Sequence, residues 1–480
     1  MGIHIMGAIL LEFTLTDSTA STKQMVYVTP NVTRLFLSRE ACSDLGIISP
    51  RFPSTLVGAF SSISLPEKPD PAPQVKLRAC TCPTRSLPPS GPIPLPVPAT
   101  EANRGILEQY LRTVFKASTF NTCNHQPLPM MSGPPLRLNI DPEATPVTAH
   151  KAASVPVHWE KMVKEHLDRD VRLGVIEKVP IGTPDTWCHR MMIVGKSNGE
   201  PRRVIDFQPL NAHATRETHH TKSPYHQARD IPRQMKKSVF DAWNGYHSVP
   251  LHPEDTHFTT FISPWGRYRY LTAPQGYKAS GDGYTARFDN LIEDIQNKTK
   301  CVDDTLLWST DIEQAFHDAA HWLIRCGSNG ITLNPDKFVF AQDTVQFAGF
   351  EISMSTVKPA RKFTKAIAEF PTPASTTDVR SWFGLVNQVA YAFSRAATMA
   401  PFRDLLKPAT KFTWTSEHQE AFEESKQTII EQINTGVEIF EKNRTTCIAT
   451  DWSKAGIGYW MFQKHCSCPQ RELLTPCAQS

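Results

Sequence analysis

Apolar and polar residues alternate in two short stretches near the start of the chain, VYVTPN and LFLS, and this period of two predicts strands. Together with the apolar stretch LGII that follows, they predict a small β-rich piece over residues 1–50. Residues 51–150 contain runs of proline and serine such as SLPEKPDPAP and SLPPSGPIPLPVP. Such segments stay extended and bury little apolar surface, so we expect a linker there.

From about residue 151 the pattern changes to a mixture of helical and strand periods. In HWEKMVKEHLDRDVRLGVI, apolar residues recur at helical spacing from Val163 to Val171, and Gly174 follows, which predicts a helix with a glycine exit. MMIVGKSNGEPRRVIDF predicts two strands around a turn, and KKSVFDAW predicts a third strand. FTTFISPWGRYRYLTAP predicts a hairpin with its turn at Pro264 to Gly266.

Two later stretches carry an apolar stripe at helical spacing. DIEQAFHDAAHWLIRCG starts with a capping pair, Asp311 and Gln314, and we expect Gly327 to end the helix. TTDVRSWFGLVNQVAYAF predicts a second helix whose stripe is formed by Val379, Phe383, Val386, Ala390 and Phe393. Strands and helices alternate up to about residue 350 and helices dominate up to about 435, so the predicted fold class is α+β.

A last strand pattern, RTTCIATDWSKAGIGYWMF, predicts a hairpin near the C-terminal end with its turn at Ser453 to Gly456. The length of 480 residues allows roughly two to four domains. The composition, 40% hydrophobic and 20% charged, is that of a globular protein, and a net charge of +4 decides nothing about nucleic acid.

The odd number of cysteines, 11 without a repeating framework, argues against a secreted disulfide scaffold and favours an intracellular protein. No apolar run approaches the 18 or so residues of a membrane span, and the first residues lack the pattern of a signal peptide. We therefore expect neither a membrane anchor nor a membrane partner.

Candidate chemistry begins with TKCVDDTLLWS, in which Asp303 and Asp304 lie side by side at the edge of an apolar strand. Two solvated turn residues would be an ordinary explanation. A half-buried pair, by contrast, needs a cation to stay ionised, and oxygen ligands favour Mg²⁺ or Mn²⁺ over zinc. Asp241 ends the predicted strand in VFDAWNGYH and supplies the third carboxylate that a phosphate-handling pair of metal ions requires.

Six motifs in order, KSNGEPRRVIDFQPLN, VFDAWNGYH, TAPQG, CVDDTLLW, GITLNPDKF and VQFAGFEIS, resemble the reverse transcriptase of gypsy-type long-terminal-repeat (LTR) retrotransposons. The resemblance runs over residues 150–435 and implies a right-hand polymerase, part of a Pol polyprotein, that extends DNA on an RNA or DNA template. It implies fingers and palm over 151–355, a thumb over 356–410 and a connection segment over 411–440. The last of these is matched by FTWTSEHQEAFEESKQTI.

The resemblance also implies roles for individual residues. Asp241, Asp303 and Asp304 would be the catalytic carboxylates that bind two Mg²⁺ or Mn²⁺ ions, with the Ala242 carbonyl completing a metal shell. A set of further positions matches residues around the incoming dNTP: Lys196 and Arg202 as the triphosphate clamp, Tyr246 as the residue that excludes a ribose 2′-hydroxyl, Gln275 and Gly276 beside the nucleotide, and Lys337 near the leaving group. Alternatives stay open for three of them: a solvated basic face for Lys196, a packed tyrosine for Tyr246 and a helix-terminal residue for Lys337.

Both ends of the chain resemble pieces of neighbouring Pol domains. ATDWSKAGIG resembles the opening hairpin of a ribonuclease H domain, which makes Asp451 its first metal ligand within residues 441–480. The other acidic ligands of that family lie farther downstream, so we expect no working ribonuclease H from this chain alone. IMGAILLEF and QMVYVTPNVTRLFLSREACSDLGII resemble the C-terminal half of a retroelement aspartic protease. Since the chain has no Asp-Ser-Gly or Asp-Thr-Gly, we expect this remnant over 1–50 to be inactive.

One departure from the family pattern is Cys301, where tyrosine or phenylalanine is more usual ahead of the acidic pair. A smaller side chain there is expected to loosen the packing under the primer end. The alternative to a polymerase is therefore a decayed or co-opted fragment that binds nucleic acid without extending it. The expected partners are a primed RNA or DNA template, dNTP and other Pol segments, in a cytoplasmic retroelement particle or in the nucleus.

Overall fold

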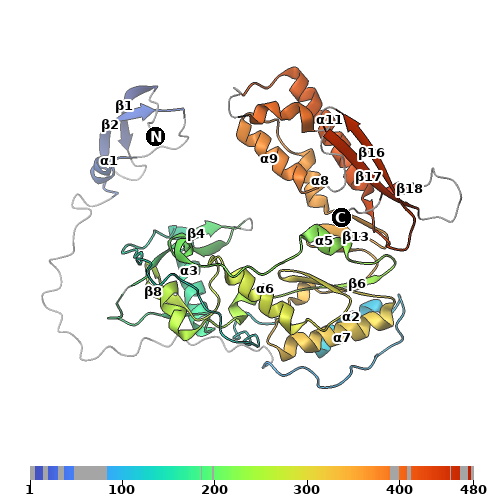
Figure 1. Ribbon diagram of the computed structural model, residues 1–480. Coiled ribbons are helices and arrows are strands. Elements are labelled where there is room, and N and C mark those ends of the chain that lie inside the picture. The colour runs from blue at the N-terminus through green and yellow to red at the C-terminus, as the bar shows by residue number, and fades with distance from the viewer. Residues whose placement is uncertain are drawn as a thin grey trace. The chain divides into compact units, whose positions relative to one another are not determined.

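The computed structural model describes residues 6–14, 20–30, 37–47, 84–184, 186–196, 199–389, 399–407, 412–453, 456–464 and 474–476. The chain divides into two compact units, Met1–Ala79 and Cys80–Ser480 (Figure 1). None of the described helices is long and apolar enough to cross a membrane.

The first unit contains an antiparallel hairpin and one short helix. β1 (Gly7–Thr14) pairs with β2 (Ser21–Val28) along its whole length, and α1 (Arg39–Asp44) follows. The Ser38 side chain accepts a hydrogen bond from the Ala41 N–H and so caps α1, and the Thr22 hydroxyl joins the sheet to the helix through Asp44 at 2.8 Å. The strand predicted at VYV is confirmed within β2, whereas Leu35 and Phe36 of the predicted strand LFLS lie outside the described residues.

The centre of the second unit is a four-stranded antiparallel sheet, which we call the palm sheet. Its strands lie in the order β11-β6-β10-β9, so the two strands that carry the acidic motifs are neighbours. Their bounds are Val339–Gln342, Lys236–Asp241, Asp304–Ser309 and Lys298–Cys301, respectively. Phe240 and Leu307 point to one face and pack in a core with the helices, while Val239 and Leu306 point to the other face and pack in a second core.

Three helices belong to the first of these cores: α2 (Arg104–Val114), α6 (Ser280–Leu291) and α7 (Ile312–Ser328). The helix α2 corrects the linker prediction for residues 51–150, because Leu107 and Leu111 are fully buried in this core. These two leucines recur at i and i+4 and form an amphipathic helix. The surrounding prolines dominated the composition of the segment and concealed this local pattern.

The helix α7 begins as predicted and ends differently. The Asp311 side chain accepts a hydrogen bond from the Gln314 N–H at 2.8 Å, which confirms the cap. Gly327 does not end the helix but lies inside it. A Cβ at this position would lie 2.4 Å from the Thr119 hydroxyl oxygen, which itself donates to the Leu323 carbonyl at 2.9 Å. Gly327 is therefore required by close packing rather than by helix termination.

We expect Gly327→Ala to destabilise the protein by about 1–3 kcal/mol because the new methyl group overlaps Thr119. This loss should outweigh the gain of up to about 1 kcal/mol in helix propensity. Gly384→Ala in α9 (Thr376–Asn387) is the matched control, since no atom lies within 4 Å of a Cβ there. Thermal unfolding of both variants tests the assignment: a higher melting temperature for both would contradict it.

The region predicted to form the fingers contains α3 (Val157–Arg172) and a five-stranded sheet in the order β3-β8-β7-β4-β5. Its strands are Ile176–Lys178, Gly266–Tyr270, Phe261–Ser263, His189–Gly195 and Pro201–Ile205. The predicted helix and both predicted hairpins are confirmed, including the turn in which Ser263 pairs with Gly266. Two short helices, α4 (Gln208–His213) and α5 (Pro224–Arg229), follow β5 and precede β6 in sequence.

The C-terminal part packs on the second core of the palm sheet. A four-stranded sheet, β12-β13-β14-β15, contains Val345–Phe347, Phe350–Ile352, Thr356–Pro359 and Val437–Glu438. The helices α8 (Arg361–Ala368), α9 and α11 (Ser416–Thr435) contribute Ile367, Trp382 and Phe422 to the same core.

The predicted stripe of α9 is present at Val379 and Val386, which are buried, whereas Ala390 and Phe393 lie outside the described residues. The hairpin of β16 (Thr446–Ser453) and β17 (Gly456–Lys464) confirms the predicted C-terminal turn, and β18 (Leu474–Pro476) pairs with β17.

Candidate active site

Three carboxylates meet at one edge of the palm sheet. Asp241 is the last residue of β6 and Asp304 the first of β10, and the two are direct partners across the antiparallel pair. Asp303 lies in the two-residue turn between β9 and β10, in which Val302 has a φ of 56°. The Asp303 carbonyl accepts the Ala242 N–H at 2.9 Å, which holds this turn against the end of β6. The backbone therefore fixes the acidic turn beside Asp241.

The carboxylates of the site lie close together, and the pKa values of two of them are raised. Burial and the neighbouring Asp241 carboxylate raise the pKa of Asp304 to about 6. Burial also raises the pKa of Asp303, whose carboxylate oxygen Oδ1 is buried and has no hydrogen-bond partner among the described residues. Lys337 supplies positive charge, because its ammonium group donates to Asp241 Oδ2 at 2.7 Å. This contact raises the pKa of Lys337.

The donor set fits a divalent cation. It consists of carboxylate oxygens, which Mg²⁺ and Mn²⁺ prefer, and it includes a buried oxygen that lacks a partner. In the described part of the chain, however, no three His, Cys, Asp or Glu side chains are arranged so that they could hold a metal ion together. The Lys337 ammonium lies at the Asp241 oxygen that a cation would contact.

A cavity of about 580 Å³ opens beside the carboxylates. Eight of the predicted site residues line it: Arg202, Asp241, Ala242, Tyr246, Gln275, Gly276, Asp303 and Lys337. Asp304 is not among the lining residues, although it is the direct partner of Asp241 across the sheet. Lys196 is not among them either; its ammonium pairs with Glu200 at 3.3 Å across the turn between β4 and β5. The structure thus brings together all predicted site residues of the palm and Arg202, but not Lys196.

Tyr246 lines the cavity, and its ring stacks on a second tyrosine ring. Its ring centroid lies 5.2 Å from that of Tyr284 on α6. Gly245 makes this stack possible, because a Cβ there would lie 2.4 Å from the Tyr284 hydroxyl oxygen. Burial raises the pKa of Tyr284 well above its ordinary value, so the hydroxyl stays protonated. The sequence analysis missed Tyr284 because it lies 38 residues from Tyr246 in sequence, without a motif of its own.

The loop that carries Gln275 and Gly276 is held by Asn211, a second residue that the sequence analysis did not single out. The Asn211 side chain donates to the Gly276 carbonyl at 2.9 Å and accepts the Lys278 N–H at 2.9 Å. Gly276 has a φ of 99°, a conformation that favours glycine. Gln275 lies 3.4 Å from the His247 Nε2 atom. Asn211 is the last residue of the motif KSNGEPRRVIDFQPLN, and this position is the signal that could have singled it out.

For two other predicted residues, Cys301 and Asp451, the structure shows the position in the fold but does not test the predicted role. Cys301 is half-buried, lies opposite Asp304 and packs against the second core; its expected effect on primer positioning stays a prediction. The backbone of Asp451 pairs with Gly458 in the β16–β17 hairpin, and its side chain lies outside the described part of the chain.

Comparisons with known proteins agree on this region. Residues 196–352 match the family described as reverse transcriptase (RNA-dependent DNA polymerase). The chain is 24% identical over 282 residues to the transposon Tf2-3 polyprotein of Schizosaccharomyces pombe and 23% identical over 282 residues to the Tf2-7 polyprotein. In both cases 57% of this chain is covered, and the chain spans about a fifth of the relatives' length, 21%.

Solved structures show the same fold. A foamy viral protease-reverse transcriptase in complex with double-stranded DNA aligns with a TM-score of 0.67 at 16% identity, covering 95% of this chain and 74% of that one. Another, in complex with an RNA/DNA hybrid, aligns with a TM-score of 0.63 at 18% identity, covering 78% and 52%. The predicted polymerase fold is confirmed at this level. Residues 196–352 are thus similar to the reverse transcriptases, and a longer part of the chain is similar to the polyproteins of Tf2 transposons.

Proposed function

We propose that the chain is an RNA-directed DNA polymerase that transfers a nucleotide from dNTP to a primer 3′-hydroxyl. The observation that carries the proposal is the pairing of Asp241 with Asp304 across β6 and β10, with the unpartnered Asp303 oxygen beside them at the mouth of a cavity. This arrangement places three carboxylates where phosphate groups would meet cations.

The three carboxylates share one role in the proposal, which is to bind metal ions. Asp241, Asp303 and Asp304 would hold two divalent ions, Mg²⁺ or Mn²⁺. When bound, such ions activate the primer hydroxyl and stabilise the charge on the leaving pyrophosphate. The carboxylates repel one another and are half-buried, which favours cation binding over an empty ionised state.

The other lining residues would recognise the nucleotide. Arg202 and Lys337 supply positive charge for the triphosphate at the cavity, and Lys337 would leave Asp241 when a metal ion binds. Tyr246 would block a ribose 2′-hydroxyl, and Gln275 with Gly276 would lie along the nucleotide. Lys196 would reach the triphosphate only after release from Glu200.

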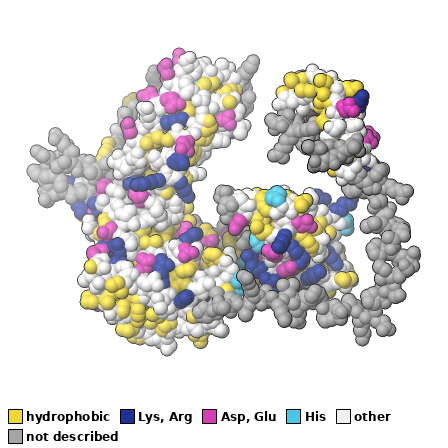
Figure 2. Space-filling view, turned by 180° about the vertical axis from the view of Figure 1, so that it is seen from behind, with side chains coloured by type: hydrophobic (Ala, Val, Ile, Leu, Met, Phe, Trp, Pro, Cys, Tyr) yellow, Lys and Arg dark blue, Asp and Glu magenta, His cyan; other side chains and the backbone are white. Residues whose placement is uncertain are grey.

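The primed template would be held mainly through its phosphate backbone, by shape rather than by sequence. The fingers expose Lys178, Arg190, Lys196 and Arg202, and Lys and Arg side chains gather over this part in Figure 2. The small overall net charge of +4 therefore conceals a basic surface near the active site.

The remaining parts of the domain division are proposals of the same kind. We assign residues 1–50 to an inactive protease remnant, 356–410 to a thumb, 411–440 to a connection and 441–480 to the start of a ribonuclease H domain. The hairpin of β1 and β2 and the hairpin of β16 and β17 support the two terminal assignments. We place the protein in a cytoplasmic retroelement particle or in the nucleus.

A primer-extension assay on poly(rA)/oligo(dT) with Mg²⁺ or Mn²⁺ tests the proposal. We expect a ladder of extended primers that disappears when EDTA is added. Binding of the same primed template without extension under either metal would overturn the proposal and support the alternative, a fragment that binds nucleic acid only. Cys301 is the feature that favours this alternative, and Cys301→Tyr should then restore extension.

A further inference from the structure

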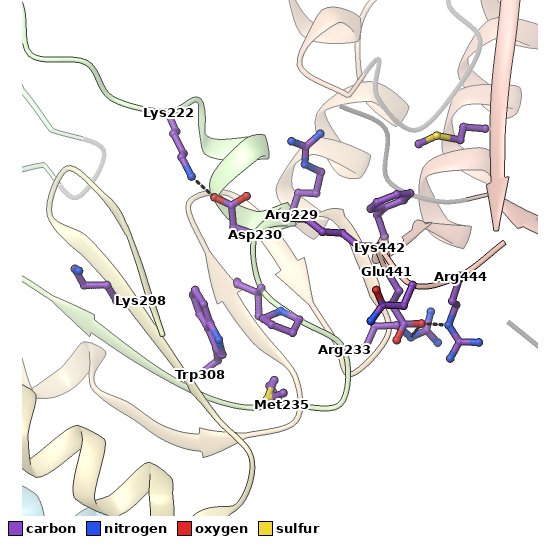
Figure 3. Close-up of a pocket in the computed structure, with 15 residues that line it drawn as sticks. Lys222, Arg229, Asp230, Arg233, Met235, Lys298, Trp308, Glu441, Lys442 and Arg444 are labelled. Atoms are coloured by element: carbon purple, nitrogen blue, oxygen red, sulfur yellow. Dashed lines mark hydrogen bonds and ion pairs between the residues drawn. The ribbon is translucent and has the colours of Figure 1, made fainter. Parts of the chain in front are cut away.

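A second and larger cavity, of about 1210 Å³, lies outside the catalytic site (Figure 3). It shares no lining residue with the catalytic cavity. Its walls come from α5 and the segment after it, from the far ends of β9 and β10, and from the segment that leads into β16. We call it the basic cavity because six basic side chains line it: Lys222, Arg229, Arg233, Lys298, Lys442 and Arg444.

The basic cavity and the catalytic carboxylates lie along the same strand of the palm sheet, β10. Trp308, which lines the cavity, follows Asp304 by four residues on β10, so both side chains lie on the same face of the sheet, about 14 Å apart along the strand. Leu306 lies between them on that face and is fully buried in the second core. The basic cavity is therefore a separate site on the carboxylate-bearing face of the palm.

Acidic side chains neutralise only part of this charge. Asp230 and Glu441 are the two acidic lining residues, against six basic ones. Lys222 pairs with Asp230 at 2.5 Å, and Glu441 pairs with Arg444 and at 3.8 Å with Arg233, which also pairs with Glu438 outside the lining. Figure 3 shows both arrangements.

Three of the cations, Arg229, Lys298 and Lys442, have no such carboxylate partner among the described residues. Within the part of the chain that the structure describes, no carboxylate lies within ion-pair distance of Arg229 or Lys442. Arg229 ends α5, and Lys442 lies in the segment that follows β15. Lys298 is held by backbone carbonyls only, those of Glu293 and Ile295. The cavity thus keeps a surplus of positive charge that an anionic ligand would satisfy.

The basic cavity also offers an aromatic surface. The half-buried indole of Trp308 and the half-buried ring of Phe440 lie among its lining residues. Basic side chains around aromatic rings are typical of sites for single-stranded nucleic acid, in which bases stack on the rings and cations contact the phosphates. The volume exceeds the roughly 300–1,000 Å³ of most small-molecule pockets, which favours a segment of a polymer.

We propose that the basic cavity binds single-stranded nucleic acid, with phosphates at Arg229 and Lys442 and a base on Trp308. A single strand fits better than a duplex, because the bases of a duplex are stacked on one another and not available to Trp308. The inference depends on the proposed polymerase function only for the presence of nucleic acid, and it can fail or succeed independently of nucleotide transfer.

The test is a binding measurement in EDTA, in which no extension can occur. We expect the full-length Arg229→Ala/Lys442→Ala variant to bind a fluorescein-labelled (dT)12 at least fivefold more weakly at 50 mM NaCl, by fluorescence anisotropy. The slope of log Kobs against log salt concentration should become shallower by about 1.4, or 0.7 for each lost phosphate contact. Trp308→Leu should weaken binding about fivefold or more without changing the slope.

Controls separate this site from general charge and from the catalytic cleft. Arg39→Ala/Lys116→Ala removes the same charge from exposed positions outside the cavity and should leave (dT)12 binding unchanged. A (dT)12 with 5-iodouracil in place of one thymine should cross-link under ultraviolet light to the peptide that contains Trp308. Unchanged affinity in the double variant, or a loss confined to a blunt duplex, would overturn the proposal whether or not the protein extends primers.

Discussion

Asp303→Asn should abolish nucleotide incorporation, with a loss of at least about 10³-fold in the single-turnover rate. The asparagine keeps the size of the side chain and removes one of the charges that would hold the divalent ions, whose electrostatic contribution to such reactions is several kcal/mol. The measurement is incorporation of one dTMP on poly(rA)/oligo(dT) by rapid quench.

The same variant should fold at least as well as the wild type. The Asp303 Oδ1 oxygen is buried without a hydrogen bond and lies beside other carboxylates, so removing its charge relieves repulsion. Asp294→Asn is the matched control on the palm: it removes an exposed carboxylate that pairs with Arg325 and should leave the rate unchanged. Extension that survives Asp303→Asn, with the melting temperature maintained, would show that Asp303 has no part in the chemistry.

Tyr246→Ala should let ribonucleotides enter the product strand. The tyrosine lines the catalytic cavity, and its truncation opens space where a 2′-hydroxyl would lie. We expect the preference for dTTP over UTP, as a ratio of kcat/KM values, to fall on the order of 10²-fold. Steady-state incorporation of each nucleotide on the same primed template measures this ratio.

A purely structural tyrosine would behave differently. Tyr246 stacks on Tyr284, and loss of that contact alone would lower the melting temperature and both rates together. Tyr246→Phe keeps the ring and should keep the preference for dTTP within about twofold of wild type. A lower rate with both nucleotides and an unchanged ratio in Tyr246→Ala would assign Tyr246 to packing.

The local sequence pattern was sufficient to predict the strands that contain the catalytic carboxylates. Asp241 and Asp304 stand at strand ends whose apolar flanks define β6 and β10, so each position followed from its neighbours in sequence. Their direct pairing across the sheet is a contact between segments 63 residues apart, which no local pattern predicts. The hairpins of the fingers followed from their turns in the same way.

Features that depend on tertiary contacts could not be predicted in this way. The helix α2 lies among prolines, and its burial depends on α7 and β11, which follow about 200 residues later. Gly327 had the sequence pattern of a helix exit, whereas its role is set by Thr119, a residue of another segment. The basic cavity combines side chains from 222 to 461, which no local motif joins. In each case long-range packing decided the outcome.

The central claim is that Asp241, Asp303 and Asp304 together hold the divalent ions of a nucleotidyl transfer site. The most direct test counts the Mn²⁺ ions bound by the full chain in complex with a dideoxy-terminated primer, its template and the next dNTP, by electron paramagnetic resonance titration. We predict two ions per chain in the wild type and a loss of at least one in Asp241→Asn and in Asp303→Asn. Mn²⁺ binding that is absent, or the same in all three proteins, would contradict the account.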